Sequence, residues 1–331
     1  LKDSLGITTE QYSWIVGGFQ LAYTLFQPLC GWLIDVIGLK IGFMICASLW
    51  GIACLLHAGA GSWIQLALLR FFMGGAEASA TPANAKIIGE WFPKSERPVA
   101  AGWAGVGFSI GAMLAPPIIY FAHASFGWQG AFMFTGALAI LWVFLWWACY
   151  NTPEEHPNLS KNELNFIRQD NEAPPVKMPF LTALKTVSKN KRFYGIAIPA
   201  FMAEPAWAVM SFWVPLYLAK AYGMDLKQIA LFAWLPFLCA DLGSIASGYL
   251  TKLYTRLFGL SRVNSVIASS VSGAFLMVSL AVIAFIDNPY IAIVLISIGG
   301  FGHQIISCML SALVVESFDK GQMATVNGMR G

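Results

Sequence analysis

The stretch GWLIDVIGLKIG, residues 31–42, decides the fold of this chain because it joins two long apolar segments through a short charged turn. Gly31 and Gly38 carry no side chain, so backbones can approach closely at the first and turn sharply at the second. Asp35 stands at the end of the first apolar segment and Lys40 lies just beyond the turn, where we expect the two to pair. The pattern predicts two helices joined end to end by a charged junction.

The composition of the chain indicates an integral membrane protein. Its 331 residues are 57% hydrophobic and 11% charged, with a mean hydropathy of +0.64, whereas soluble domains carry about 25% charged residues. A helix needs about 20 apolar residues to cross a bilayer. The segments that fit are 13–36, 40–59, 63–89, 99–121, 130–150, 193–219, 227–251, 264–286 and 290–317. They predict an all-α integral membrane protein. The net charge of +3 is small and says nothing about nucleic acid, and we expect no nucleic-acid partner.

A polar interruption divides these spans into two sets. It covers 151–192 and separates an N-terminal half-bundle (1–150) from a C-terminal half-bundle (193–331). Within the interruption, Ser160 is placed to cap a short amphipathic helix, with Glu163 at the capping-box position. Both ends of the chain look cut. One helix before the first span and two after the last would make twelve, so we expect the spans to be helices 2–10, followed by the start of helix 11.

Positive charge is unevenly distributed between the connecting loops. Alternate loops, including the long one, hold most of the Lys and Arg residues, and the opposite set holds only Lys2, Lys220 and Lys227. Because short cytoplasmic loops carry an excess of Lys and Arg, we expect the long central loop to face the cytoplasm.

Arg70 and Glu77 lie within one apolar segment, SWIQLALLRFFMGGAEASATPANA, residues 62–85. A charge at the bilayer centre costs about 2.5–3.5 kcal/mol on insertion scales. Seven residues of helix separate the two by about 10 Å on one face, and this face must line the interior of the bundle. A cation beside a protonatable acid favours an anion site next to a proton site; the alternative is a buried ion pair that holds helices together.

Several signatures in the chain resemble those of one family. Residues 31–42 resemble the loop signature of the major facilitator superfamily, G-x-x-x-D-x-x-G-x-K/R, and EWFPKSER (90–97) resembles the W-F-P-x-x-E-R signature of its anion:cation symporter branch. Within that branch, further stretches resemble the bacterial hexuronate transporters. They are SIGAMLAPP (109–117), AEPAW (203–207), LFAWLP (231–236) and GGFGHQ (299–304).

The resemblance implies two pseudo-symmetric six-helix halves with helices 1, 4, 7 and 10 lining the transport path. It also implies a monomer in the bacterial inner membrane that takes up a hexuronate, such as glucuronate or galacturonate, with protons. The alternative is a symporter of an aldonate such as galactonate, or of another small organic anion. Gly31, Asp35, Gly38 and Lys40 would stabilise one end state of the transport cycle rather than contact substrate. The driving force would be the proton gradient, with no cofactor.

The resemblance places Arg70 and Glu77 on helix 4, where related symporters carry a proton-accepting acid. Deprotonated Glu77 would hold Arg70, and protonation would release Arg70 toward the substrate carboxylate. An arginine on helix 1 contacts the carboxylate in related symporters. Further polar residues fall on helices 2, 7 and 10, and we expect these to bind substrate: Tyr23, Gln27, Glu204, Trp207, His303 and Gln304.

Four of these residues have an alternative role. Glu204, also a candidate proton site, could be a neutral or paired structural group, and His303 could bridge two helices through its imidazole. Tyr23 and Gln27 could form hydrogen bonds between helices, which are worth about 0.6 kcal/mol each in a bundle.

Other functional classes fit the sequence less well. The histidines and cysteines have no metal-ligand spacing, which indicates no metal site and no metalloenzyme. A channel would need repeated polar rings along its pore, and no such repeat occurs in the sequence.

Overall fold

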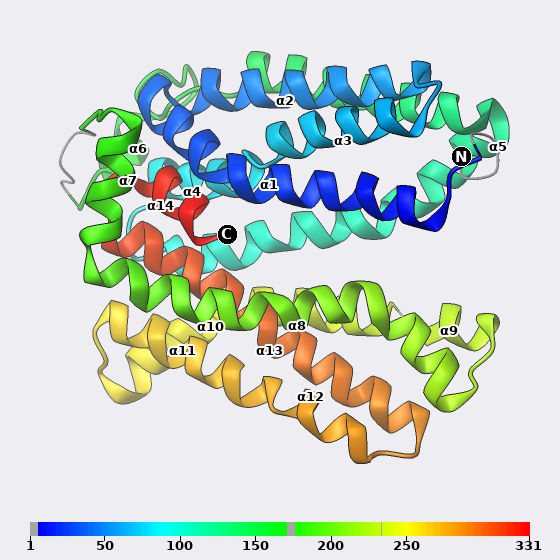
Figure 1. Cartoon of the computed structure of the whole chain (residues 1–331). Helices are drawn as coiled ribbons and strands as arrows, with labels where there is room; N and C mark the ends of the chain where they lie inside the picture. The colour runs from blue at the N-terminus through cyan, green and yellow to red at the C-terminus, as the bar shows by residue number, and fades with distance from the viewer. Residues whose placement is uncertain (1–5, 171–175, 233) are drawn as a thin grey trace.

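The structure of the chain is a computed structural model that describes residues 6–170, 176–232 and 234–331. The secondary-structure elements of these residues are all helices (Figure 1). The first group is α1 (Thr9–Ile37), α2 (Leu39–Leu56), η1 (His57–Gly59), α3 (Trp63–Glu77), α4 (Ala80–Trp91) and α5 (Arg97–Cys149). The second group is α8 (Lys191–Tyr222), α9 (Leu226–Phe232), α10 (Leu235–Phe258), α11 (Arg262–Met277), α12 (Ser279–Val282), η2 (Ile283–Phe285) and α13 (Pro289–Ser317).

Helices lie within every span expected from the sequence, but several of these spans are not one continuous helix. Five helical segments among the described residues are long and apolar enough to cross a membrane: Leu39–Gly59, Phe121–Cys149, Lys191–Met210, Arg262–Phe285 and Pro289–Ser317. The prediction of an all-α membrane protein is confirmed.

Three of the expected spans within residues 1–150 are divided or joined differently in the structure. The expected helix over 63–89 is interrupted directly after Glu77, where Ala78 and Ser79 separate α3 from α4. The expected spans 99–121 and 130–150 instead share α5, which bends at Gly127 with φ of 70°. Only glycine adopts that backbone conformation at little cost, so the chain reverses there without a loop.

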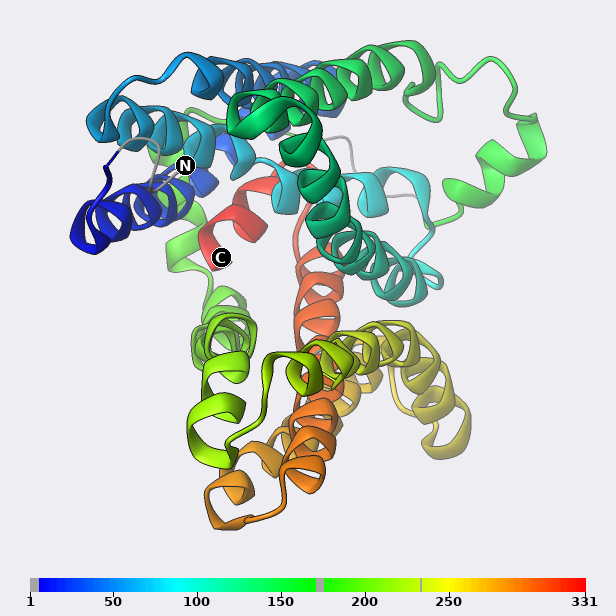
Figure 2. The ribbon, with the colours of Figure 1, turned by 90° about the vertical axis from the view of Figure 1, so that its right-hand side faces the viewer.

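The two groups of helices lie side by side (Figures 1 and 2). α10 and α13 of the second group pack against α5 of the first. The last helix, α14 (Met323–Arg330), lies between the groups and contacts α1 and α4 on one side and α8 and α13 on the other. The division into an N-terminal half, a linker and a C-terminal half stays a prediction.

The linker carries α6 (Lys161–Ile167) and α7 (Phe180–Lys189) at one end of the molecule, which we call the linker end (Figure 1). The capping box of α6 is confirmed: Glu163 N donates to Ser160 Oγ at 3.2 Å, and Ser160 N donates to a Glu163 carboxylate oxygen at 2.9 Å. The Ser160 hydroxyl also donates to the Glu163 carboxylate, at 2.7 Å. The hydroxyl and, to a lesser extent, the backbone N–H of Ser160 hold the pKa of Glu163 below its ordinary value. Residues 171–175 of the predicted linker lie outside the described residues.

Candidate functional site

Arg70 and Glu77 lie on the same helix, α3, which begins where Ser62 accepts a hydrogen bond from Gln65 N at 3.3 Å. The two interact electrostatically, yet no direct salt bridge joins them in the described part of the chain. The Arg70 guanidinium instead lies 5.9 Å from the ring centroid of Phe19 and 6.0 Å from that of Phe132. The alternative of a buried ion pair is therefore not what this conformation shows.

α1 contributes Tyr23 and Gln27. The Tyr23 hydroxyl lies 3.3 Å from Thr81 Oγ1 of α4, so Tyr23 does form a hydrogen bond between helices. Tyr23 also interacts electrostatically with Glu77 of the first group and with Glu204 of the second. Gln27 is 2% exposed, and its Oε1 has no hydrogen-bond partner among the described residues. Tyr23 thus interacts with one acidic candidate of each group.

α8 and α13 place the candidates of the second group together. Trp207 stacks on His303 with ring centroids 5.0 Å apart and an interplanar angle of 15°. His303 is 2% exposed, and neither of its ring nitrogens has a hydrogen-bond partner within the described ranges. Among the described residues, the imidazole therefore does not bridge two helices by hydrogen bonds. Gln304, the next residue of α13, is only partly buried.

Two residues of α14 complete this polar set, and sequence reasoning missed both. Asn327 is 1% exposed; its Nδ2 donates to the Thr81 carbonyl at 2.9 Å, while its Oδ1 has no partner among the residues described. Arg330 donates through Nη1 to Ser311 Oγ at 2.9 Å and interacts electrostatically with Glu204 and His303. The available signal was an asparagine and an arginine three residues apart, a spacing that puts both on one helix face.

The candidate site therefore draws polar side chains from both groups. Gln27, His303 and Asn327 each leave a buried polar atom without a hydrogen-bond partner among the described residues. An unsatisfied buried polar group costs about 1–3 kcal/mol. A ligand rich in hydroxyl groups would supply donors and acceptors for all three, and Arg70 and Arg330 would attract a negatively charged one. The described residues contain no cluster of His, Cys, Asp or Glu that could hold a metal ion.

Asp35 makes a different set of contacts from those expected. Its carboxylate accepts hydrogen bonds from Thr325 N at 2.8 Å and Thr325 Oγ1 at 2.7 Å, and it pairs with Lys86 at 2.9 Å. The predicted pair with Lys40 is wrong, because Lys40 donates to Asn151 Oδ1 at 2.8 Å. The junction turn directs Lys40 toward the start of the linker, whereas Asp35 faces α14.

The glycines of the 31–42 stretch have the predicted roles. A Cβ on Gly31 would overlap the Ala324 carbonyl, so α1 and α14 are in backbone contact there. Gly38 has φ of 93° and forms the turn between α1 and α2. Asp35 thereby reaches the first turn of α14, where unpaired backbone N–H groups favour a carboxylate.

Arg97 of the 90–97 signature forms hydrogen bonds to the ends of neighbouring helices. Its side chain is buried, with 1% of it exposed. It donates to three carbonyl groups, each at 3.1 Å: that of Gly89 in α4, that of Phe92 just after α4, and that of Val315 in α13. These bonds join the first group to the second near the linker end.

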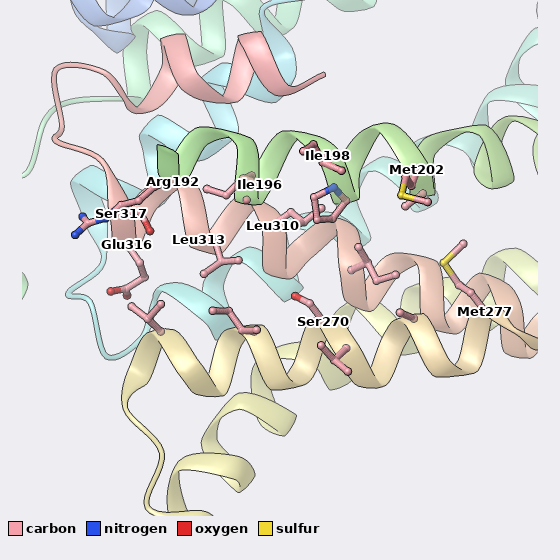
Figure 3. Close-up of a pocket in the computed structure, with 18 residues that line it drawn as sticks. Arg192, Ile196, Ile198, Met202, Ser270, Met277, Leu310, Leu313, Glu316 and Ser317 are labelled. Atoms are coloured by element: carbon pink, nitrogen blue, oxygen red, sulfur yellow. The ribbon is translucent and has the colours of Figure 1, made fainter. Parts of the chain in front are cut away.

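A large pocket lies elsewhere, between α8, α11 and α13 (Figure 3). Its volume is about 850 Å³, and most of its lining is apolar, including Ile196, Met202 and Leu310. None of the candidate site residues lines this pocket. An apolar lining offers few partners for a hydroxylated anion, so the pocket is not the candidate site.

Comparison with known proteins identifies the family. The family model described as "Major Facilitator Superfamily" matches residues 1–331. The chain belongs to the major facilitator superfamily. Its fold agrees with a crystal structure of a member of this superfamily, FucP, in the outward conformation, with a TM-score of 0.71 at 13% identity, over 98% of this chain and 80% of that one.

Two curated members of the superfamily are much more similar in sequence. The hexuronate transporter of Escherichia coli (strain K12) is 42% identical over 332 residues, covering 100% of this chain and 77% of that protein. The galacturonate transporter of Dickeya chrysanthemi is 41% identical over 295 residues, covering 88% of this chain and 85% of that protein.

Proposed function

We propose that this protein is a secondary transporter that takes up a hexuronate, such as glucuronate or galacturonate, together with protons. The observation that carries the proposal is that buried polar atoms of α1, α13 and α14 lack hydrogen-bond partners among the described residues. Arg330 of α14 and Arg70 of α3 add the cations. A hexuronate has one carboxylate and several hydroxyls, which match these two kinds of group. The similarity to the hexuronate and galacturonate transporters supports the same substrate class.

In the proposed mechanism, substrate binds between the two groups near the bilayer midplane, as in other two-half transporters. Glu77 accepts the coupled proton, and Arg70 binds the carboxylate. The Asp35 contacts with α14 hold the linker end closed while the site is loaded from the opposite side. The protein works as a monomer in a bacterial inner membrane, with the linker in the cytoplasm and the proton gradient as its driving force.

Uptake into proteoliposomes tests the proposal. With the full-length protein and an imposed pH gradient, labelled glucuronate and galacturonate should accumulate above their external concentration, and an uncoupler should abolish accumulation. Unlabelled galactonate should compete poorly. If galactonate were concentrated and the hexuronates were not, the substrate class would be an aldonate and the proposal would be wrong.

A further inference from the structure

Another cavity lies at the linker end, between the start of α5 and the end of α10. Its volume is about 460 Å³, within the range of about 300–1,000 Å³ typical of ligand pockets. The first group contributes Ser95, Pro98 and Val99 to its lining, and the second contributes the last turns of α10 and the first residue of α11. None of the candidate site residues lines it. The cavity is therefore a separate feature of the contact between the two groups.

Positive charge dominates the lining of this cavity. Lys252 and Arg256 lie one helical turn apart on one side of α10, and Arg262 at the start of α11 completes the set. Arg262 has one acidic partner, Asp170 of the linker, at 4.0 Å, whereas Lys252 and Arg256 form no salt bridge within the described ranges. Glu96 and Lys252 both line a neighbouring cavity. Even with both acids counted, the three cations leave a net positive charge.

The walls of the cavity belong to different groups, and their backbones are in contact. A Cβ on Gly248 of α10 would lie 2.5 Å from the Cα of Val99 in α5. Further along the same contact, Ser244 Oγ donates to the Gly102 carbonyl at 2.7 Å. If α5 and α10 separated at the linker end, these contacts and the cavity would be lost. A ligand that fits the cavity would therefore bind the closed conformation more tightly and shift the population toward it.

The surroundings of the cavity are those of a membrane surface. The expected span 227–251 ends directly before Lys252. Leu253 and Leu257, which each follow one of the cations in sequence, are 46% and 63% exposed. Exposed leucines beside cations suit the boundary between lipid and water, because long cationic side chains near the ends of membrane helices extend to the polar interface. Basic pockets on the cytoplasmic side of membrane proteins bind anionic lipid head groups, so these features favour a lipid over a soluble phosphate compound.

We propose that this cavity binds the phosphate group of an anionic phospholipid of the cytoplasmic leaflet, and that the bound lipid stabilises the conformation closed at the linker end. Arg256 and Arg262 each offer a planar fork of donors to phosphate oxygens, and Lys252 adds a compact charge. Ser95 offers a hydroxyl from the first group, so one phosphate would contact both groups. The inference rests on the proposed function only for the orientation of the linker, since the substrate has no part in it.

Lipid binding is the first test. Purified full-length protein would be titrated with phosphatidylglycerol in detergent micelles, and the bound lipid would be counted by native mass spectrometry. Lys252→Gln/Arg256→Gln should bind phosphatidylglycerol about tenfold or more weakly than wild type, because two cations near an anionic lipid surface are lost. Lys252→Arg/Arg256→Lys keeps both charges and should bind like wild type. Lys161→Gln/Lys177→Gln, at exposed linker positions, removes the same charge elsewhere and should also bind like wild type.

Further probes identify the source of the phosphate. Phosphatidylcholine, which has no net charge, should bind equally to wild type and Lys252→Gln/Arg256→Gln. Glycerol 3-phosphate, a phosphate without acyl chains, should not displace phosphatidylglycerol at equal concentration. Displacement by glycerol 3-phosphate would make the occupant a soluble phosphate compound, and the lipid assignment would be wrong. An equal loss of phosphatidylglycerol binding in Lys161→Gln/Lys177→Gln would show a general effect of charge and would refute the site.

The second test measures closure of the linker end. Thr325 is 1% exposed and contacts Asp35 there, so a cysteine at position 325, in a background without the native cysteines, should react with maleimide mainly when this end opens. Its reactivity should be lower in phosphatidylglycerol nanodiscs than in phosphatidylcholine nanodiscs. Lys252→Gln/Arg256→Gln should remove that difference, and Lys161→Gln/Lys177→Gln should keep it.

Equal reactivity of position 325 in both lipids, with the cavity residues intact, would refute the stabilising role of the lipid. Neither measurement uses a sugar, so both remain valid whatever the substrate is. Normal lipid binding by a protein that fails to accumulate hexuronates would overturn the proposed function and leave the lipid site standing.

Discussion

Arg70 and Glu77 show how helix geometry sets the distance between two charged residues. Seven residues of α3 hold their backbones about 10 Å apart, so the pair interacts over distance without a direct salt bridge in the described structure. The guanidinium rests near two aromatic rings, Phe19 and Phe132. Such cation–π contacts are worth about 0.5–2 kcal/mol, and an anionic ligand would compete with them readily.

Arg70→Ala should abolish hexuronate uptake, because the proposed carboxylate ligand is lost. Arg70→Lys should leave weak transport that needs more substrate, since an ammonium cannot form two parallel hydrogen bonds to a carboxylate. Initial rates of labelled glucuronate uptake, measured over a range of concentrations, check both outcomes. Lys161→Ala, at an exposed position of the linker, is the control; wild-type uptake by Arg70→Ala would refute the assignment.

Glu77→Gln should keep exchange of labelled for unlabelled hexuronate but lose accumulation driven by a pH gradient. The amide mimics the protonated acid permanently, so the substrate can still cross while the proton is no longer carried. Counterflow and gradient-driven uptake in the same proteoliposomes separate the two activities. Accumulation by Glu77→Gln in response to a pH gradient would place the proton site elsewhere, with Glu204 as the next candidate.

At the scale of elements, the end of α1 acts as a cap for α14. Asp35 supplies the acceptor that the first turn of α14 lacks, and Lys86 of α4 balances its charge. Lys86 also donates to the Lys320 carbonyl, just before α14. Three helices and a loop thus meet at one carboxylate, which explains why an aspartate stands at the end of an apolar helix.

Asp35→Ala should loosen this junction, because Lys86 is 3% exposed and would lose its carboxylate partner. Removing one member of a buried ion pair costs about 3–5 kcal/mol, so the midpoint of thermal unfolding should fall. A cysteine introduced at Thr325 should become more reactive toward maleimide in Asp35→Ala than in an otherwise wild-type protein. Glu155→Ala, at an exposed residue of the linker, should change neither measurement, and unchanged reactivity at position 325 would contradict the capping role.

At the scale of the whole molecule, contacts between the two groups gather around α14 and the helix ends near the linker. Asp35, Asn327 and Arg97 each join elements that are more than two hundred residues apart in sequence. α7 adds to this end, since Trp32 of α1 donates to the Met178 carbonyl at 2.8 Å and packs on Phe180 with centroids 5.5 Å apart. The arrangement favours a molecule closed at the linker end.

The linker should lie in the cytoplasm, because the Lys and Arg residues concentrate in it and in the loops on its side. A single cysteine at Asn158, in a background without the native cysteines, should resist a membrane-impermeant maleimide in intact cells. The same cysteine should react in inverted vesicles. Labelling from outside intact cells would reverse the orientation.

The sequence alone determined the fold class, the membrane environment and most candidate residues. Apolar spans and rare intramembrane charges are local properties, because lipid penalises each exposed polar group wherever it occurs in the chain. The helical spans, the α6 cap and the turn at Gly38 follow from such local preferences. Family signatures at 31–42 and 90–97 add the superfamily, which the match over the whole chain confirms.

Only the tertiary structure decided which partners these residues have. Asp35 contacts Thr325 rather than Lys40, Trp207 stacks on His303, and Asn327 and Arg330 enter the candidate site. The sequence shows only which opposite charges lie close along the chain. In the fold, the partner of a charged residue depends on how helices that are distant in sequence pack together. α14 is short and weakly apolar, and it joins the site only because the two groups of helices close around it.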